Sequence, residues 1–142
     1  MEKQKQIAIL GSTGSIGRQA LEVIAANRNR FQVYALTANN NVDLLVQQAR
    51  TFTPNVVCIA NEKHYATLKQ QLEDLPIKVF AGSDAIDQVV QMQGVDIVLA
   101  AMVGYAGLKP TIAAIEAGKI IALANKETLV VAGELICDLA NR

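Results

Sequence analysis

Three glycines spaced three residues apart, Gly11, Gly14 and Gly17, come directly after the apolar run 7–10. An apolar-periodic stretch begins at Ile16, so the pattern predicts a strand, a tight turn and a helix. Glycine permits the backbone angles of such a turn and lets a ligand approach the main chain closely. The free N–H groups and the dipole of the helix favour an anion at its start. The predicted chemistry is binding of a dinucleotide pyrophosphate, and a glycine-rich turn without a ligand is the alternative.

A second candidate segment follows the second predicted strand, where the chain reads Leu36-Thr37-Ala38-Asn39-Asn40-Asn41. Domains that bind NAD usually carry a carboxylate here for the adenosine ribose. No carboxylate occurs before Asp43, and its absence permits a 2′-phosphate and therefore NADP(H). The three asparagines offer amide donors to phosphate or ribose oxygens. The alternative is a turn in which Asn41 only caps the next helix.

Two later segments complete the candidate site. The small residues of 100–108 allow close approach to the sugar and nicotinamide of a cofactor, or form a hinge before the next helix. Asn125-Lys126-Glu127 follows the last predicted strand, and Asn125 is placed to cap a helix. Lys126 opposes the helix dipole there, which fits a lysine held for an anionic ligand and equally a solvated lysine without a role.

Strand-like and helix-like segments alternate along the whole chain, which predicts an α/β fold with a doubly wound, mostly parallel sheet. Asn41, Asn61 and Ser83 are predicted helix caps, and Gly118 is a predicted helix stop. The expected strands are 6–10, 31–37, 55–59, 77–81, 95–100 and 120–123. The expected helices are 15–27, 42–52, 62–73, 84–92, 108–117 and 126–140.

Composition narrows the class of protein. The 142 residues suffice for one domain, 51% are hydrophobic, and 13 basic residues balance 13 acidic ones. The sequence has no long basic run of the kind that predicts nucleic-acid binding, and no apolar run long enough to predict a membrane span. Its polar N-terminal residues lead to the expectation of a cytoplasmic location. Cys58 lies in an apolar run and is expected to be buried, Cys137 is far away, and His64 is expected to be solvated. These residues predict neither a metal site nor a histidine-dependent triad.

Several motifs together resemble one family, 1-deoxy-D-xylulose 5-phosphate reductoisomerase. They are residues 10–17 (LGSTGSIG), 103–108 (VGYAGL) and 123–127 (LANKE), with 110–115 and 117–119 also similar. The resemblance spans essentially the whole chain and implies a Rossmann-like domain, residues 1–142, that binds NADPH. It implies substrate binding by Lys126, and cofactor binding by Gly11, Thr13, Gly14, Ser15, Ile16, Ala38, Asn39, Asn40, Asn41, Ala101, Asn125 and Glu127.

The chain departs from this family at two points. The family commonly has a glycine, a basic residue and an asparagine after the second strand, whereas this chain has Asn39-Asn40-Asn41. The resemblance also implies a central domain with the carboxylates for Mn or Mg and a C-terminal helical domain. Both are expected outside residues 1–142, so the catalytic residues and metal ligands are expected there too.

The resemblance implies a homodimeric parent enzyme that isomerises 1-deoxy-D-xylulose 5-phosphate and reduces the product with NADPH to 2-C-methyl-D-erythritol 4-phosphate, in non-mevalonate isoprenoid synthesis. The isolated domain is expected to be inactive alone. Two alternatives stay open at this point. One is the NADP-binding domain of another reductase, such as one resembling the semialdehyde dehydrogenases, and the other is a nucleotide-sensing module without catalysis.

Overall fold

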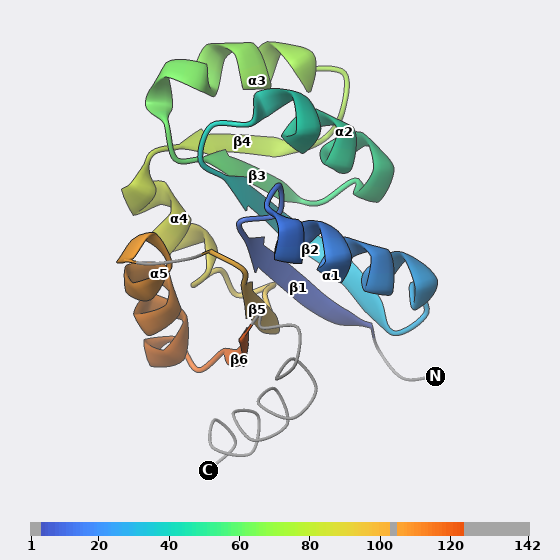
Figure 1. The fold of residues 1–142 in the computed structure, drawn as a ribbon, viewed down its shortest axis with the longest axis vertical. Helices are drawn as coiled ribbons and strands as arrows, with labels where there is room; N and C mark the ends of the chain where they lie inside the picture. Colours follow the sequence, from blue (N-terminus) through green and yellow to red (C-terminus); the bar gives the residue numbers. More distant parts are fainter. Residues whose placement is uncertain (1–3, 103–104, 124–142) are drawn as a thin grey trace.

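The computed structural model describes residues 4–102 and 105–123 and has one six-stranded parallel sheet in the order β4-β3-β2-β1-β5-β6 (Figure 1). The predicted fold class is therefore confirmed. The strands are β1 (Lys5–Leu10), β2 (Phe31–Ala38), β3 (Val56–Ile59), β4 (Lys78–Ala81), β5 (Ile97–Ala100) and β6 (Ile120–Leu123). The helices are α1 (Ser15–Ala26), α2 (Val42–Phe52), the 3-10 helix η1 (Glu62–His64), α3 (Tyr65–Gln71), α4 (Ser83–Val89) and α5 (Tyr105–Glu116).

Two apolar cores, one on each face of the sheet, hold the layers together. Ile7 and Ile9 of β1 point into the core that α1, α2 and α3 cover, whereas Ala8 and Leu10 point into the core beneath α4 and α5. This alternation follows from the two-residue period of a strand. Because both faces are covered, the strands are nearly continuous in apolar residues, as buried parallel strands are.

The chain runs outward from β1 through β2 and β3 to β4, and then crosses to the other side of β1 to form β5 and β6. β1 and β5 are paired in register from Ile7 opposite Ile97 to Leu10 opposite Ala100. The order of strands therefore reverses between β1 and β5. In open parallel sheets the carboxyl ends at such a reversal form a crevice in which ligands bind.

Helix boundaries agree with the sequence in part. The side chains of Asn41 and Asn61 cap α2 and η1, and Gly118 follows α5 with φ +78°. The predicted cap Ser83 is wrong, because Gly82 precedes α4 with φ +104° and Ser83 is its first helical residue. The expected helix 62–73 is a 3-10 turn followed by α3, and α5 begins at Tyr105 rather than at residue 108.

The early start of α5 has a packing reason. A Cβ at Gly107 would lie 3.0 Å from the carbonyl oxygen of Met102, so this helical turn sits close to the loop after β5. Gly107 therefore lets the first turn of α5 pack closely against Met102, whereas the sequence suggested that Gly107 belongs to a loop. The expected helix 126–140 and Cys137 lie outside the described residues.

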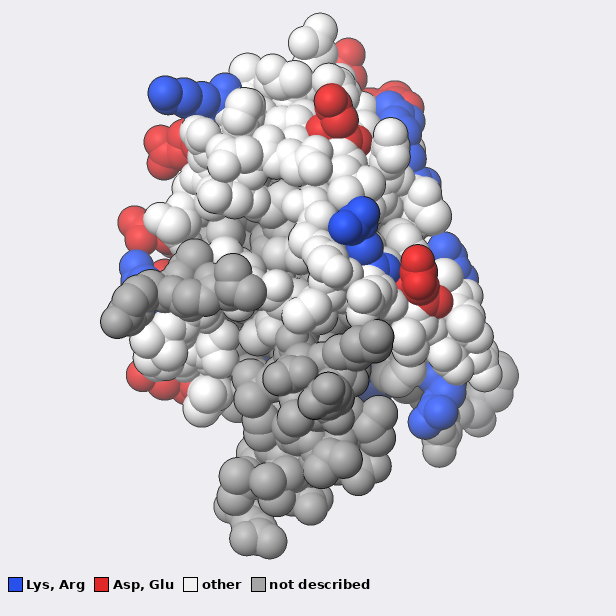
Figure 2. Space-filling model, in the orientation of Figure 1, with Lys and Arg blue, Asp and Glu red and all other residues white. Residues whose placement is uncertain are grey.

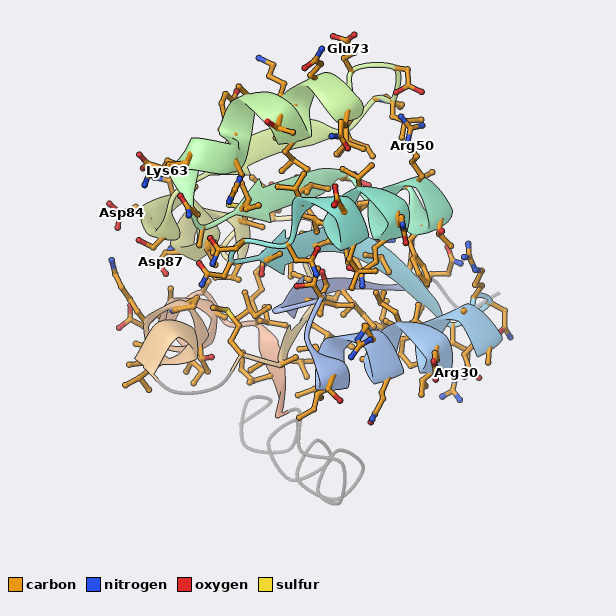
Figure 3. All side chains as sticks on the ribbon, turned by 45° about the horizontal axis from the view of Figure 1, so that its top comes forward. Arg30, Arg50, Lys63, Glu73, Asp84 and Asp87 are labelled. Carbon is orange, nitrogen blue, oxygen red and sulfur yellow. The ribbon has the colours of Figure 1, made fainter. Side chains whose placement is uncertain are left out.

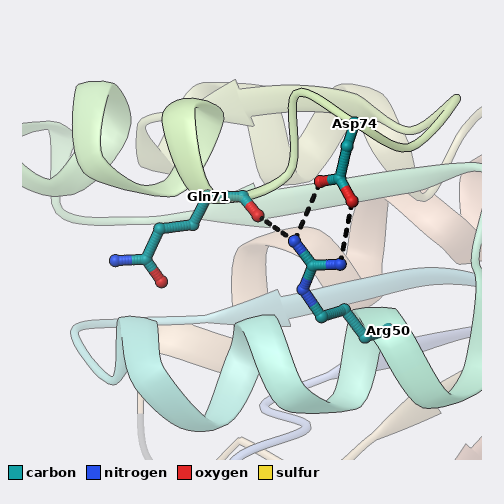
Figure 4. Close-up of polar contacts among 3 residues, drawn as sticks. All are labelled: Arg50, Gln71 and Asp74. Carbon is teal, nitrogen blue, oxygen red and sulfur yellow. Dashed lines mark hydrogen bonds and ion pairs between the residues drawn. The ribbon is translucent and has the colours of Figure 1, made fainter.

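An exposed ion pair fixes α2 to the turn after α3 (Figure 4). Arg50 donates both terminal nitrogens to the carboxylate of Asp74, at 2.8 and 3.1 Å, and donates to the carbonyl oxygen of Gln71 at 2.7 Å. The hydrogen bond from Arg50 lowers the pKa of Asp74. Both side chains are solvated, so the pair specifies geometry more than it adds to stability.

Candidate functional site

A cavity of about 630 Å³ opens at the carboxyl ends of the strands, next to the reversal between β1 and β5. Side chains from both halves of the sheet meet there. Its lining residues are Gly11, Thr13 and Gly14 after β1, Asn39 after β2, Ala60 after β3, Ser83, Ile86 and Asp87 of α4, Ala101 and Met102 after β5, and Lys109 and Pro110 of α5.

Figure 2 shows both basic and acidic side chains on the part of the face in view that is not drawn in grey. Figure 3 shows Lys63, Asp84 and Asp87 together at the end of the sheet where the strands finish, whereas Arg30 lies at the opposite end.

The turn between β1 and α1 is built around the first two glycines. Gly11 has φ +82°, a left-handed conformation that favours glycine, and the N–H of Gly14 donates to its carbonyl oxygen at 3.3 Å. Gly14 is the N-cap of α1, and no side chain caps this helix. The first N–H groups of an α-helix have no acceptor within the helix. In α1 the exposed residues Gly14 and Ser15 leave these donors open to an anion.

Gly17 has a packing role, because it is buried against the turn. A Cβ at this position would lie 2.7 Å from Cα of Ser12 and would also overlap the carbonyl oxygen of Gly11. The absence of a side chain lets α1 sit directly on the end of β1. Of the three glycines in the motif, Gly11 and Gly14 therefore shape the open surface and Gly17 brings the helix close enough.

Polar side chains that sequence analysis missed hold the turn from below. Thr37 of β2 is buried, and its hydroxyl donates to the carbonyl oxygen of Ile9 while accepting from the N–H of Gly11. The N–H of Ser12 donates to the carbonyl oxygen of Thr37 at 2.8 Å, and Gln48 of α2 donates to that of Ser12 at 2.9 Å. The only feature of the sequence that could have indicated these residues is a hydroxyl or amide side chain on an otherwise apolar face of a strand or helix.

The asparagine segment after β2 is tied to the loop after β3. Asn61 donates from its side chain to that of Asn40 at 2.7 Å, and from its backbone to the carbonyl oxygen of Asn39 at 3.1 Å. Asn41 accepts from the N–H of Leu44 and caps α2. Asn39 and Asn40 are exposed, and of these residues Asn39 lines the cavity. The segment thus forms a fixed rim with amide groups at the surface.

The opposite wall carries the charged groups of the cavity. Lys109 of α5 lies 3.0 Å from carboxylate oxygens of both Asp84 and Asp87 on α4. Hydrogen bonds to Asp87 and Asp84 raise the pKa of Lys109 above its usual value. Oδ1 of Asp87 is buried and has no hydrogen-bond partner among the described residues. The lysine joins two helices and offsets one of the two carboxylate charges on this wall.

The structure brings together some of the predicted site residues. Those that line the cavity are Gly11, Thr13, Gly14, Asn39 and Ala101, while Ser15 and Ile16 occupy the first turn of α1 beside it. Ala38 is buried at the end of β2, and Asn40 and Asn41 form the rim behind Asn39. Asn125, Lys126 and Glu127 lie outside the described residues.

Cys58 and His64 are not among the residues that line the cavity. Among residues 4–102 and 105–123, no group of three or more His, Cys, Asp and Glu side chains is arranged to hold a metal ion. No helix in the same part of the chain combines the length and apolar composition needed to cross a membrane. Cys58 of β3 is fully buried, as expected, and burial raises the pKa of its thiol to about 12.

We expect Cys58 to resist alkylation in the folded protein. Only the thiolate reacts, and a pKa raised from 9.0 to about 12 lowers its fraction near pH 8 by roughly 1,000-fold. The measurement is iodoacetamide labelling of a Cys137→Ser variant at pH 8, with and without urea. Labelling should follow unfolding. Equal rates in both solutions would show that Cys58 is accessible.

Comparison with known proteins places the chain in a narrow group. The family model described as 1-deoxy-D-xylulose 5-phosphate reductoisomerase matches residues 7–133. The reductoisomerase of Phocaeicola vulgatus is 69% identical over 139 residues, covering 98% of this chain and 36% of that protein. That of Bacteroides thetaiotaomicron is 68% identical over 140 residues, covering 99% and 36%. The chain thus spans about a third of the length of these relatives.

Solved structures agree with the sequence comparison. The reductoisomerase from Zymomonas mobilis in complex with NADPH superposes with a TM-score of 0.82 at 43% identity, covering 98% of this chain and 36% of that one. A reductoisomerase in complex with NADPH, fosmidomycin and magnesium superposes with a TM-score of 0.82 at 42% identity, covering 96% and 34%. The architecture described above is thus that of part of these enzymes.

Proposed function

This chain belongs to the 1-deoxy-D-xylulose 5-phosphate reductoisomerase family, and we propose that it forms the domain that holds NADPH for that reaction. The observation that carries the proposal is the glycine turn. It places an uncapped helix N-terminus beside a 630 Å³ cavity at the strand reversal. The relatives include structures with NADPH bound, which supports the choice of cofactor.

The geometry of the glycine turn supports a dinucleotide in this cavity. A Cβ at Gly14 would have open space on the ligand side, since the nearest protein atom, the carbonyl oxygen of Gly11, is 3.6 Å away. The turn therefore offers room for phosphate oxygens directly on the backbone. We assign the pyrophosphate to Gly11, Thr13, Gly14, Ser15 and Ile16.

The two sugars are assigned to opposite ends of the same crevice. Ala38 and the three asparagines Asn39, Asn40 and Asn41 are proposed to hold the adenosine ribose and its 2′-phosphate. Ala101 lies at the end of β5, across the strand reversal, and is proposed to contact the ribose on the nicotinamide side. Asn125 and Glu127 are proposed to bind near the reactive end of the cofactor.

When bound, NADPH supplies a hydride to the aldehyde formed from the substrate. The described residues contribute to that step by holding the cofactor at both ends, because a hydride donor must be positioned within contact distance of its acceptor. No described side chain needs to move a proton for this task. The proposal thus assigns binding and orientation to this chain.

The remaining parts of the proposal concern the whole enzyme. We propose that it converts 1-deoxy-D-xylulose 5-phosphate to 2-C-methyl-D-erythritol 4-phosphate, that Lys126 binds this phosphosugar, and that residues 1–142 form one NADPH-binding domain. The metal, Mn or Mg, and the catalytic groups are proposed to lie in other domains, consistent with magnesium and fosmidomycin in related structures. We also propose a cytoplasmic homodimer.

Calorimetric titration of the 142-residue chain with NADPH and with NADH tests the function. We expect one site per chain and tighter binding of NADPH, because the segment 38–41 has no carboxylate to repel the 2′-phosphate. Equal affinity for both cofactors would refute the assignment of this segment. Absence of binding for both would refute the proposed function of the chain.

Replacement of Asn40 by lysine should raise the preference for NADPH over NADH by about tenfold. A cation beside a phosphate adds a charge-assisted hydrogen bond, which is worth roughly 1.5–3 kcal/mol. The ratio of the two dissociation constants is the measurement. Asn40→Ala is the control, since it also loses the bond to Asn61 but adds no charge. An unchanged ratio in Asn40→Lys would show that Asn40 does not face the 2′-phosphate.

A further inference from the structure

Three buried polar residues stand out in the part of the chain that the structure describes. Ser12, Thr37 and Gln48 are the polar residues there that are almost fully removed from solvent, with exposed fractions of 0%, 0% and 7%. All three belong to one hydrogen-bonded cluster beneath the glycine turn. Burying an amide or hydroxyl costs free energy unless it is paired, so the cluster requires an explanation beyond core packing.

Gln48 is the member that reaches the turn from another helix. It lies on α2 between the buried residues Leu45 and Ala49, and its Nε2 donates to the carbonyl oxygen of Ser12 at 2.9 Å. Its Oε1 is buried and has no partner among the described residues. An apolar side chain would suit this helix face better, so the bond to Ser12 accounts for the amide.

The hydrogen bond from Gln48 to the carbonyl oxygen of Ser12 determines the orientation of the next backbone donor, the N–H of Thr13. The carbonyl of Ser12 and the N–H of Thr13 belong to the same peptide group, and the described part of the chain contains no cis peptide. In a planar trans peptide the C=O and the N–H point in opposite directions. Because Gln48 holds the carbonyl toward the interior, the N–H of Thr13 is directed away from it. Thr13 lines the cavity, and its N–H has no acceptor among the described residues.

We infer that Gln48 is a positioning residue, which holds the Ser12–Thr13 peptide so that the Thr13 N–H faces the pyrophosphate of the bound dinucleotide. The inference rests on the proposed function, because it needs an anion in the turn. Without the amide, rotation of this peptide would turn the donor inward and present a carbonyl oxygen to the phosphate. Gln48 would thereby act on affinity without touching the ligand.

The test compares Gln48→Met with Gln47→Met in the full 142-residue chain. Gln47 is the neighbouring residue on α2 but is exposed, so its replacement controls for the change of residue type. Two ligands are titrated: NADPH, and adenosine 2′-phosphate, which has no pyrophosphate. We expect Gln48→Met to weaken NADPH binding about tenfold, as loss of one well-placed donor does, and to leave adenosine 2′-phosphate within about twofold. Gln47→Met should change neither.

Equal loss of both ligands would show that Gln48 only supports the fold, and undiminished NADPH binding would also overturn the inference. Urea unfolding confirms that each variant is folded, and Gln48→Leu, which is close in size and has no donor, replaces Gln48→Met if that variant is unfolded. If the unmodified chain does not bind NADPH, the proposed function fails by itself. In that case the NMR signal of the Thr13 amide is followed while inorganic pyrophosphate is added to the unmodified chain and to Gln48→Met. A shift in the unmodified chain that is abolished in Gln48→Met supports the inference. An identical shift in both chains, or no shift in the unmodified chain, refutes it.

Discussion

Replacement of Gly17 by alanine should destabilise the chain by about 3 kcal/mol or more, at the upper end of the usual cost of overpacking. The added Cβ would lie 2.7 Å from Cα of Ser12 and would overlap the carbonyl oxygen of Gly11, and both are backbone atoms. Backbone cannot move aside as a flexible side chain does, so α1 must shift away from β1. Urea unfolding followed by circular dichroism measures the loss.

The matched control for this variant is Gly14→Ala in the same turn. Gly14 has φ −76°, and a Cβ there would meet no protein atom closer than 3.6 Å. Alanine is a poorer N-cap than glycine but restricts the unfolded chain more, so the two effects oppose each other and Gly14→Ala should cost no more than about 1 kcal/mol. A stability of Gly17→Ala equal to that of Gly14→Ala would contradict the close packing of α1 on the turn.

Replacement of Gly14 by valine should reduce the affinity for NADPH by at least about 100-fold while the fold persists. The backbone at Gly14 is extended, a conformation that valine adopts readily, and the residue is exposed. Valine is a poorer N-cap than glycine, so the expected cost in stability is only about 1 kcal/mol. The two methyl groups would occupy the space assigned to phosphate oxygens, and displacement of the ligand from the helix N-terminus removes most of its charge-assisted contacts.

Gly14→Ala again provides the comparison, now for binding. Its single methyl group fills less of the cavity, so its affinity for NADPH should lie between those of the unmodified chain and Gly14→Val. Fluorescence titration with NADPH measures all three. An affinity of Gly14→Val equal to that of the unmodified chain would show that the phosphate site has been assigned to the wrong segment.

Much of this fold was predictable because its local signals agree with one another. The six strands were found from apolar runs flanked by turn residues, and α2 was found with its cap at Asn41. The glycine spacing indicated the turn after β1, and the alternation of elements indicated that other loops would meet it at the strand ends. Errors occurred where a residue type suits two kinds of position. Gly107 suggested a loop but lies in α5 and packs against Met102, and Ser83 suggested a cap but is the first helical residue after Gly82.

The support beneath the turn was not predictable from local pattern. Thr37 suits a buried strand because it is β-branched, and Gln48 suits the polar side of an amphipathic helix. Their roles depend on contacts with Ile9, Gly11 and Ser12, which are 26 to 36 residues away. Only the three-dimensional arrangement shows that both reach the same turn.

Backbone amide signals of the ¹⁵N-labelled 142-residue chain during titration with NADPH show which residues bind the cofactor. We expect the largest changes at Thr13, Gly14, Ser15 and Ile16, with further changes at Asn39 and Ala101. A second cavity of about 440 Å³, lined in part by Tyr34 and Lys78, lies elsewhere in the molecule and serves as an internal reference. Changes confined to that cavity, or none at the glycine turn, would refute the binding of the cofactor phosphates at this turn.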